Sequence, residues 1–292
     1  MILNVSGRTD VVAFYTDWFM NRYREGFVDV RNPFNEKLVS RIYFEDVDAI
    51  MFCTKNPIPI VKRLKEIKKP ILFHVTITPY KKEIENNVID KTKIIEAVKK
   101  ISNIVGIDNL YIRYDPIFIN DYYTVSYHIK AFDKLCSLLE GYTKHIIVSF
   151  LDEYKNVLKN KNIMKYKELT DDDYKRIGTS FSRSAKGHGI TVQTCMEEHD
   201  LVKYGFIKGE CLSHVLAYKL TGKSNFKSWK ARGCNCVEMV DIGSYNTCNH
   251  LCRYCYANYS EEDIKKNMKM HDKDSSLLIG YIKDDDIIKR RR

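Results

Sequence analysis

The stretch that decides the fold begins with Ile71-Leu-Phe-His-Val-Thr-Ile77, continues through residues 91–104 and ends in Leu110-Tyr-Ile-Arg113. The two short apolar segments favour buried strands. The run between them places Ile94 and Val98 on one face of an amphipathic helix. A strand, a helix and a second strand in this order form a βαβ unit with parallel strands.

The same alternation extends over the first two-thirds of the chain. We expect strands at residues 2–5, 27–30, 49–53, 71–77, 110–113, 146–150 and 190–193. We also expect four more helices between these strands. One runs from Asp10 to Gly26, one starts at Pro57, one covers residues 123–140, and one starts after Thr170. Asp10 and Thr170 would be the N-caps of their helices, and Gly26 would end the first helix.

Right-handed crossovers of about seven such units close naturally into a barrel. The sequence therefore predicts an α/β fold, namely a partial or complete (β/α) TIM-type barrel. An open doubly wound sheet is the alternative. It is less favoured because Ser6-Gly-Arg-Thr-Asp10, after the first strand, is not the glycine-rich phosphate turn typical of such sheets.

The composition favours a cytoplasmic protein whose cysteine thiols are reduced. No apolar run of the 292 residues reaches ~18 residues, so we expect no transmembrane helix and no membrane partner. The opening Met1-Ile-Leu-Asn-Val5 is too short, and lacks the basic start, for a signal peptide. In the cytoplasm thiols stay reduced, so metal binding explains the nine cysteines better than disulfides do.

The net charge of +10 permits an anionic partner such as nucleic acid. The simpler interpretation is that lysines coat the helices, because no basic run is interleaved with stacking aromatics. Nucleic acid is therefore a possible partner that the sequence does not favour.

Five cysteines lie between Cys234 and Cys255, and the last three are spaced C-x3-C-x2-C at Cys248, Cys252 and Cys255. Thiolates are soft ligands that suit zinc or iron–sulfur iron. Three cysteines bind three corners of a four-iron cube and leave the fourth iron open to a small molecule. The alternative is a structural zinc ion completed by a fourth cysteine or by His250.

This spacing, with the aromatic Tyr254 just before the last cysteine, resembles the cluster motif of the radical S-adenosylmethionine (SAM) enzymes. The resemblance implies that SAM binds the open iron of a 4Fe-4S cluster through its amino and carboxylate groups. It also implies that an electron, from a donor such as flavodoxin or ferredoxin, cleaves SAM to a 5′-deoxyadenosyl radical. In that superfamily the motif lies near the N-terminus, whereas here it begins at Cys248.

The C-terminal position of the motif resembles a domain-of-unknown-function family whose members carry a radical-SAM-like cysteine cluster there. The segments that match are Asp241 to Asn258, Ser6 to Asp10, Thr54 to Pro57 and Arg113 to Pro116. The resemblance covers most of the chain. Cys53 departs from it, because relatives usually have tryptophan before the Thr-Lys-Asn-Pro run.

Four further cysteines, Cys195, Cys211, Cys234 and Cys236, match positions that recur in these relatives. Four thiolates can saturate a second, auxiliary 4Fe-4S cluster, which we expect here. A zinc site and plain buried thiols are the alternatives.

Polar residues follow the predicted strands, at the end where barrel enzymes place their chemistry. The candidate catalytic residues are Arg8, Asp10, Lys55, Tyr80 and Glu85, and the candidate cofactor-binding residues are Thr54, Lys55, Asn56, Arg113 and Asp115. The cations among them suit the carboxylate of SAM. Singly, each could be a cap or a turn residue, and Arg113 with Asp115 could be an internal pair that braces the loop before Pro116.

We therefore expect a barrel over residues 1–195, a cysteine-rich iron–sulfur segment over its mouth at 196–259, and a charged tail at 260–292 whose last residues are frayed. The predicted function is a radical-SAM-like iron–sulfur enzyme acting on an unknown substrate. The alternatives are an iron–sulfur electron-transfer protein and a zinc-stabilised nucleic-acid-binding protein.

Overall fold

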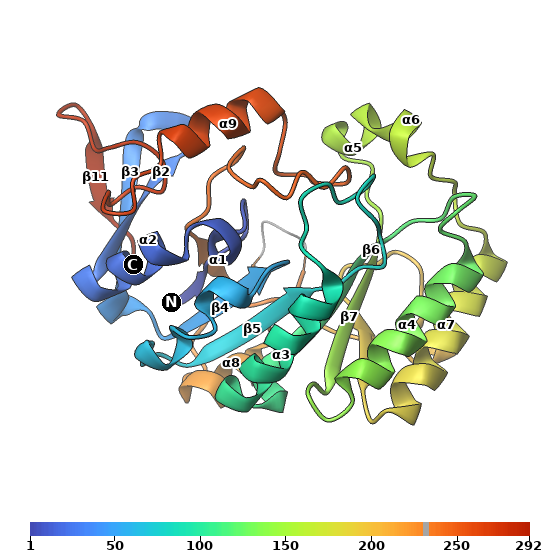
Figure 1. Cartoon of the computed structure of the whole chain (residues 1–292). Helices are drawn as coiled ribbons and strands as arrows, with labels where there is room; N and C mark the ends of the chain where they lie inside the picture. The colour runs from blue at the N-terminus through green and yellow to red at the C-terminus, as the bar shows by residue number, and fades with distance from the viewer. Residues whose placement is uncertain (230–233) are drawn as a thin grey trace.

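The computed structural model describes residues 1–229 and 234–292, and its centre is a sheet of eight parallel strands (Figure 1). From one edge to the other the strands are β10 (Met239–Asp241), β1 (Ile2–Asn4), β4 (Ala49–Thr54), β5 (Ile71–Thr76), β6 (Leu110–Ile117), β7 (His145–Phe150), β8 (Thr191–Thr194) and β9 (Ile207–Lys208). The apolar runs that predicted strands from the sequence account for six of these eight, all except β9 and β10.

The sheet is open, so the prediction of a TIM-type barrel, partial or complete, is wrong. Within residues 1–229 and 234–292, β9 and β10 form opposite edges and each pairs with a single neighbour. A barrel closes only when its edge strands pair with each other. Here the edges are strands of 2 and 3 residues, which offer few hydrogen bonds for closure. A Rossmann-like α/β fold describes the arrangement better, and the missing glycine-rich turn was a poor guide because it reports on a phosphate ligand rather than on topology.

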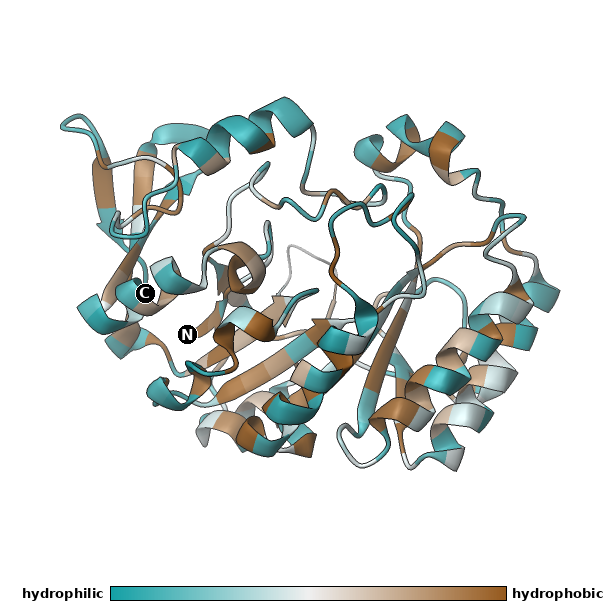
Figure 2. Ribbon diagram, viewed as in Figure 1, coloured by the Kyte–Doolittle hydropathy of each residue, from teal (hydrophilic) through white to brown (hydrophobic). Residues whose placement is uncertain are grey.

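Helices cover both faces of the sheet, and Figure 2 shows that hydrophobic residues concentrate on the strands. One face packs against α1 (Val11–Phe14), α2 (Thr16–Glu25), α3 (Lys91–Val105), α4 (Val125–Leu139) and α7 (Asp171–Gly187). The other face packs against α8 (His214–Thr221) and the chain around it. Neighbouring strand residues such as Leu72 and Phe73 point to opposite faces, and they belong to the two different cores.

The predicted helix boundaries are confirmed in part. Asp10 caps α1 by accepting from the Ala13 N–H at 2.9 Å, and Thr170 caps α7. Gly26 ends α2 with a φ of 85°, which only glycine adopts readily. The helix expected from Pro57 is instead two short 3₁₀ turns, Ile58–Ile60 and Leu64–Glu66.

A small second sheet accounts for two further corrections. The segment expected as the second barrel strand is β2 (Phe27–Asn32), which pairs antiparallel with β3 (Asn35–Tyr43), and β11 (Ile287–Arg290) adds to β3 in parallel. The chain end is therefore not frayed at residues 287–290. Its strand character comes from pairing with β3 rather than from its own polar pattern, which is why the sequence did not indicate it.

The remaining elements are short. Helices α5 (Lys155–Lys159) and α6 (Lys161–Met164) follow β7, and α9 (Glu261–Lys269) follows the cysteine-rich loop. Further 3₁₀ turns cover Phe44–Asp46, Ile107–Asn109 and Val202–Tyr204. In Figure 1 the cysteine-rich loop between β10 and α9 passes above the sheet, beside the loop that joins β5 to α3.

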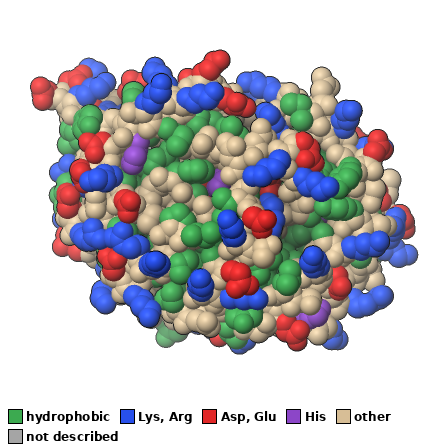
Figure 3. All heavy atoms as spheres, in the orientation of Figure 1, with side chains coloured by type: hydrophobic (Ala, Val, Ile, Leu, Met, Phe, Trp, Pro, Cys, Tyr) green, Lys and Arg blue, Asp and Glu red, His purple; other side chains and the backbone are tan. Residues whose placement is uncertain are grey.

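The surface shows no grouping of the excess positive charge on the face drawn in Figure 3, where Lys and Arg alternate with Asp and Glu. This distribution fits lysines that coat the helices. Among the described helices, none is both long enough and apolar enough to cross a membrane.

Candidate functional site

The loop that carries Cys248, Cys252 and Cys255 is fastened to the carboxyl edge of the sheet. The loop after β5 holds it through backbone bonds, from the Asn87 N–H to the His250 carbonyl at 3.0 Å and from the Arg253 N–H to the Ile84 carbonyl at 2.9 Å. Because the carboxyl ends of parallel strands share one edge, these contacts place the three cysteines beside the polar ends of β1, β4 and β5.

The three thiols of this loop influence one another electrostatically but do not form a tight group. Burial raises the pKa of all three, and the neighbouring Cys252 and Cys255 raise that of Cys248 further. For the described residues, the three sulfur atoms do not all lie within 4.8 Å of one another. A bound cation would instead lower the pKa of these three thiols and favour their thiolate form.

Asp10 connects this loop to the sheet. Its Oδ2 accepts from the Thr54 hydroxyl at 3.0 Å, the Lys55 N–H at 2.8 Å and His250 Nε2 at 2.9 Å, while Oδ1 caps α1. The side chain is only 5% exposed. Asp10 and Thr54, both predicted site residues, are therefore brought together, and both are occupied in positioning the cysteine loop.

The sequence singled out His250 only as an alternative zinc ligand. The structure buries it against the Phe14 ring, with 4.7 Å between centroids, and ties its Nε2 to Asp10. In the described part of the chain, Nδ1 of His250 has no hydrogen-bond partner. Its position two residues after Cys248 is the signal that sequence reasoning could have used.

Glu85 and Lys55, both predicted catalytic residues, form a buried ion pair beside Cys252. Lys55 Nζ lies 2.8 Å from Glu85, whose side chain is 1% exposed and also accepts from Lys91, Thr78 and Tyr254. Burial alone would raise the pKa of Glu85, but the two ammonium groups lower it to about 2. Two lysines for one carboxylate leave an excess positive charge next to the Cys252 sulfur.

Tyr80 and Asn56, also predicted site residues, are engaged with the backbone. The Tyr80 hydroxyl donates to the Pro116 carbonyl at 2.9 Å and accepts from the Phe118 N–H at 2.9 Å. The Asn56 side chain accepts from the Ile58 N–H at 3.2 Å. These contacts brace the loops around the site.

Arg8 is paired with Asp241, the first residue of the C-terminal segment that matched the family. Nε of Arg8 lies 2.6 Å from Asp241, which also accepts from the Gly7 N–H at 2.6 Å. A Cβ on Gly7 would lie 2.7 Å from the Asp241 carboxyl, so this close approach requires glycine.

Arg113 and Asp115 form the internal pair that the sequence offered as the alternative to a SAM contact. Arg113 Nη2 lies 2.5 Å from Asp115 Oδ2, and Nη1 lies 3.2 Å from the Cys211 sulfur. Arg113 is therefore directed at the second group of cysteines rather than at the loop of Cys248.

That second group consists of Cys195, Cys211 and Cys236, whose sulfur atoms all lie within 4.8 Å of one another. They come from the end of β8, the loop after β9 and the segment after α8. Cys234, predicted to join them, lies outside this group among the described residues.

Glu197 is a candidate that the sequence analysis missed. It accepts from the Ser149 hydroxyl at 2.6 Å and from the Phe150 N–H at 3.1 Å. Burial raises its pKa to about 7, with a further contribution from Asp115, although the two hydrogen bonds oppose the shift. A carboxyl group that titrates near neutrality is suited to acid–base catalysis. The position of Glu197, two residues after Cys195 and close to the end of β8, was the available signal.

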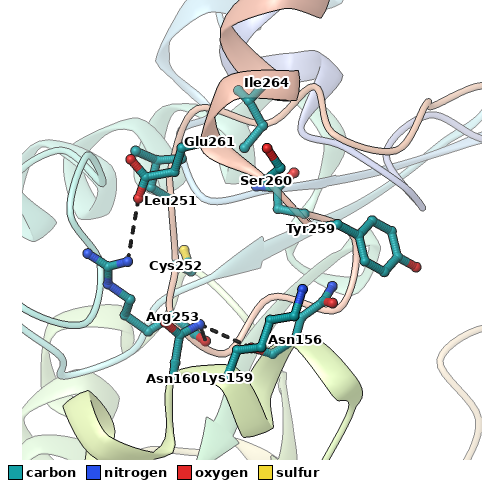
Figure 4. Close-up of a pocket in the computed structure, with 11 residues that line it drawn as sticks. Asn156, Lys159, Asn160, Leu251, Cys252, Arg253, Tyr259, Ser260, Glu261 and Ile264 are labelled. Carbon is teal, nitrogen blue, oxygen red and sulfur yellow. Dashed lines mark hydrogen bonds and ion pairs between the residues drawn. The ribbon is translucent and has the colours of Figure 1, made fainter.

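A pocket opens beside Cys252 on the outer side of the loop (Figure 4). It lies between Asn156 and Asn160 on one side and the start of α9 on the other. The Asn160 amide donates to the Arg253 carbonyl at 2.8 Å. The pocket gives solvent a path to the cysteine loop.

We predict that Asp10→Ala lowers the free energy of unfolding by at least about 3 kcal/mol, because it removes a buried carboxylate that accepts four hydrogen bonds. The control is Asp90→Ala, which removes an exposed N-cap of α3 and should cost much less. Urea unfolding of both variants measures the difference. Equal losses would show that Asp10 acts only as a cap.

Glu85 should make stability depend on pH. Its pKa in the folded protein lies below the ordinary 4.5, so the ionised carboxylate stabilises the fold above pH 4.5. The contribution is lost as the pH falls from 4.5 towards about 2. The expected quantity is the unfolding free energy of the wild type minus that of Glu85→Gln. This difference should be about 3 kcal/mol larger at about pH 6 than near pH 2.

The exposed Glu96, which pairs with Lys99 at 3.3 Å, provides the control for this measurement. Glu96→Gln should show little change in its difference from wild type across the same pH range. A pH-independent difference between wild type and Glu85→Gln would contradict the assigned role of the buried pair.

The comparisons with known proteins identify the family but no activity. No curated protein matches the chain. The model of a family described as a domain of unknown function (DUF1848) matches residues 2–257, which is most of the chain. This match confirms the resemblance to a family of unknown function. The chain therefore belongs to the DUF1848 family.

Proposed function

We propose that this protein is a radical-SAM-like iron–sulfur enzyme in which Cys248, Cys252 and Cys255 hold a 4Fe-4S cluster that binds SAM. The observation that carries the proposal is the C-x3-C-x2-C loop, fastened over the carboxyl edge of a parallel sheet with Cys248 buried and with Cys252 and Cys255 partly exposed. When bound, the cluster and SAM supply a 5′-deoxyadenosyl radical. The substrate of the enzyme would be a small molecule or a polymer that reaches the carboxyl edge of the sheet.

The spacing of the three thiols supports a cluster rather than a single ion. Sulfur atoms around one tetrahedral zinc ion lie about 3.8 Å apart, given a Zn–S bond of about 2.3 Å. For the part of the chain described, the sulfurs of Cys248, Cys252 and Cys255 do not all fall within 4.8 Å. A cube holds each thiolate at its own corner and therefore accepts ligands that are set farther apart.

The buried charges fit the same assignment. Lys55 and Lys91 share the single carboxylate of Glu85, and the resulting positive charge favours the thiolate form of Cys252. Arg8 and Arg113 are each paired with an aspartate, which leaves Lys55 as the best placed cation for the carboxylate of SAM. Lys55 can turn towards a ligand without stranding Glu85, because Lys91 remains paired with it.

The open sheet suits a ligand at this edge, since Rossmann-like folds bind ligands outside the carboxyl ends of their strands. Glu197 lies at the same edge, after β8, and can exchange a proton with a substrate near neutral pH. A cluster of this type needs a reducing compartment and an electron donor. We therefore place the protein in the cytoplasm, with a flavodoxin or ferredoxin as its partner.

The test is anaerobic reconstitution followed by reduction in the presence of SAM. We expect the wild type to form 5′-deoxyadenosine, and Cys255→Ala to lose this activity together with about four iron atoms per chain. Cooperative unfolding should be retained, because the loop lies outside the main core. Cys136→Ala, a buried thiol of α4 in that core, is the matched control and should keep both iron and activity.

Two outcomes would contradict the proposal. Unchanged iron in Cys255→Ala would remove this cysteine from the ligands. A full cluster without SAM cleavage would indicate electron transfer instead of radical chemistry.

A further inference from the structure

The second cysteine group joins three segments that are far apart in the chain. Cys195 directly follows β8, Cys211 follows β9, and Cys236 lies on the segment that returns from α8 to β10. The backbone around them is paired as well, since the Val237 N–H donates to the Leu212 carbonyl at 3.0 Å. The group borders the smaller of the two large cores, on the α8 face of the sheet.

The spacing of these sulfurs differs from that of the Cys248 loop. All three lie within 4.8 Å of one another, close to the separation of about 3.8 Å between thiolates on one tetrahedral ion. An iron–sulfur cube would have to push them apart. We propose that Cys195, Cys211 and Cys236 hold a single thiophilic divalent ion of the zinc class rather than an auxiliary cluster. Cys234 lies outside the group in this structure but only two residues before Cys236, and it would move in as the fourth ligand when the ion binds.

Arg113 supplies the outer contact that such a site needs. Its Nη1 lies 3.2 Å from the Cys211 sulfur, and Asp115 fixes the guanidinium at 2.5 Å. Four thiolates carry more negative charge than a divalent ion neutralises, so a cation that donates to one sulfur stabilises the complex. A pair that only braced the loop would not need this contact with Cys211. The contact therefore gives the Arg113–Asp115 pair a role in stabilising the bound ion.

His74 provides a second, independent indication. It lies on β5 between Cys53 and Tyr111 of the neighbouring strands, is fully buried, and is within electrostatic reach of Cys211. As far as the structure is described, neither ring nitrogen has a hydrogen-bond partner. Buried imidazoles are rarely left in this state. A Cys211 thiolate, kept in that form by a bound ion, would offer His74 a negative partner that the neutral thiol does not.

The ion would act as a structural staple. It would tie the end of β8 to the segment that carries α8 and covers one face of the sheet. Because the three ligands come together only in the folded chain, the free energy of metal binding becomes free energy of folding. The proposal does not depend on the chemistry at Cys248, Cys252 and Cys255.

Metal and acid-labile sulfide analysis of the full chain tests the proposal. We expect Cys211→Ser to lose one zinc ion per chain, to keep the iron and sulfide of the wild type, and to melt several degrees lower. Cys234→Ser should lose its zinc to a chelator faster than the wild type does. Cys136→Ser is the control and should keep its full metal content.

Cobalt provides a check on geometry that is independent of zinc. Co²⁺ added to chelator-treated wild type should produce thiolate-to-cobalt absorption bands that saturate at one ion per chain, and Cys211→Ser should not produce them.

Three results would overturn the proposal or part of it. Loss of about four iron atoms with their sulfide in Cys211→Ser would establish an auxiliary cluster. Unchanged metal content in that variant would exclude a metal. Unchanged chelator resistance in Cys234→Ser would remove the fourth thiolate. Failure of the radical-SAM proposal would instead appear in Cys255→Ala, so the two are distinguishable.

Discussion

The bond between Asp10 and His250 is the contact on which the arrangement of the site depends. It joins the loop after β1 to the cysteine loop across 240 residues of sequence, at 2.9 Å and almost out of contact with water. The same carboxylate oxygen accepts from Thr54 and Lys55 at the end of β4. A buried charge is stable only when it is fully paired, so Asp10 draws these segments to one point. The position of the three cysteines over the sheet edge follows from this requirement.

The two sets of cysteines share one arrangement of charges. In each, a carboxylate holds a cation close to a cysteine: Glu85 holds Lys55 near Cys252, and Asp115 holds Arg113 against Cys211. What differs is the spacing of the sulfurs, which suits a cube in the first group and a single ion in the second. On the two proposals, the first group serves chemistry and the second serves stability.

Local patterns in the sequence predicted what local forces determine. Apolar runs gave six of the eight parallel strands, and Asp10, Thr170 and Gly26 marked helix ends correctly. Closure of the sheet was predicted wrongly, because it depends on pairing between edge strands of 2 and 3 residues that carry no pattern of their own. β11 was missed for the same reason, since β3 induces it.

The candidate site also has features that the sequence predicted and features that only the structure shows. The cysteine spacing was readable, and so was the polar character of the strand ends. The partners of those residues were not, because Arg8 with Asp241 and Arg113 with Cys211 meet only through long-range folding. Glu197 escaped notice because a single glutamate in a loop carries no pattern, and its raised pKa arises from burial that only the structure reveals.

The most direct test of the central claim is a Mössbauer spectrum of iron-labelled protein, recorded with and without SAM. An open corner on a cluster held by Cys248, Cys252 and Cys255 predicts that one iron site changes its signal when SAM is added, while the other irons of the cluster do not. A spectrum that is unchanged by SAM would contradict the account.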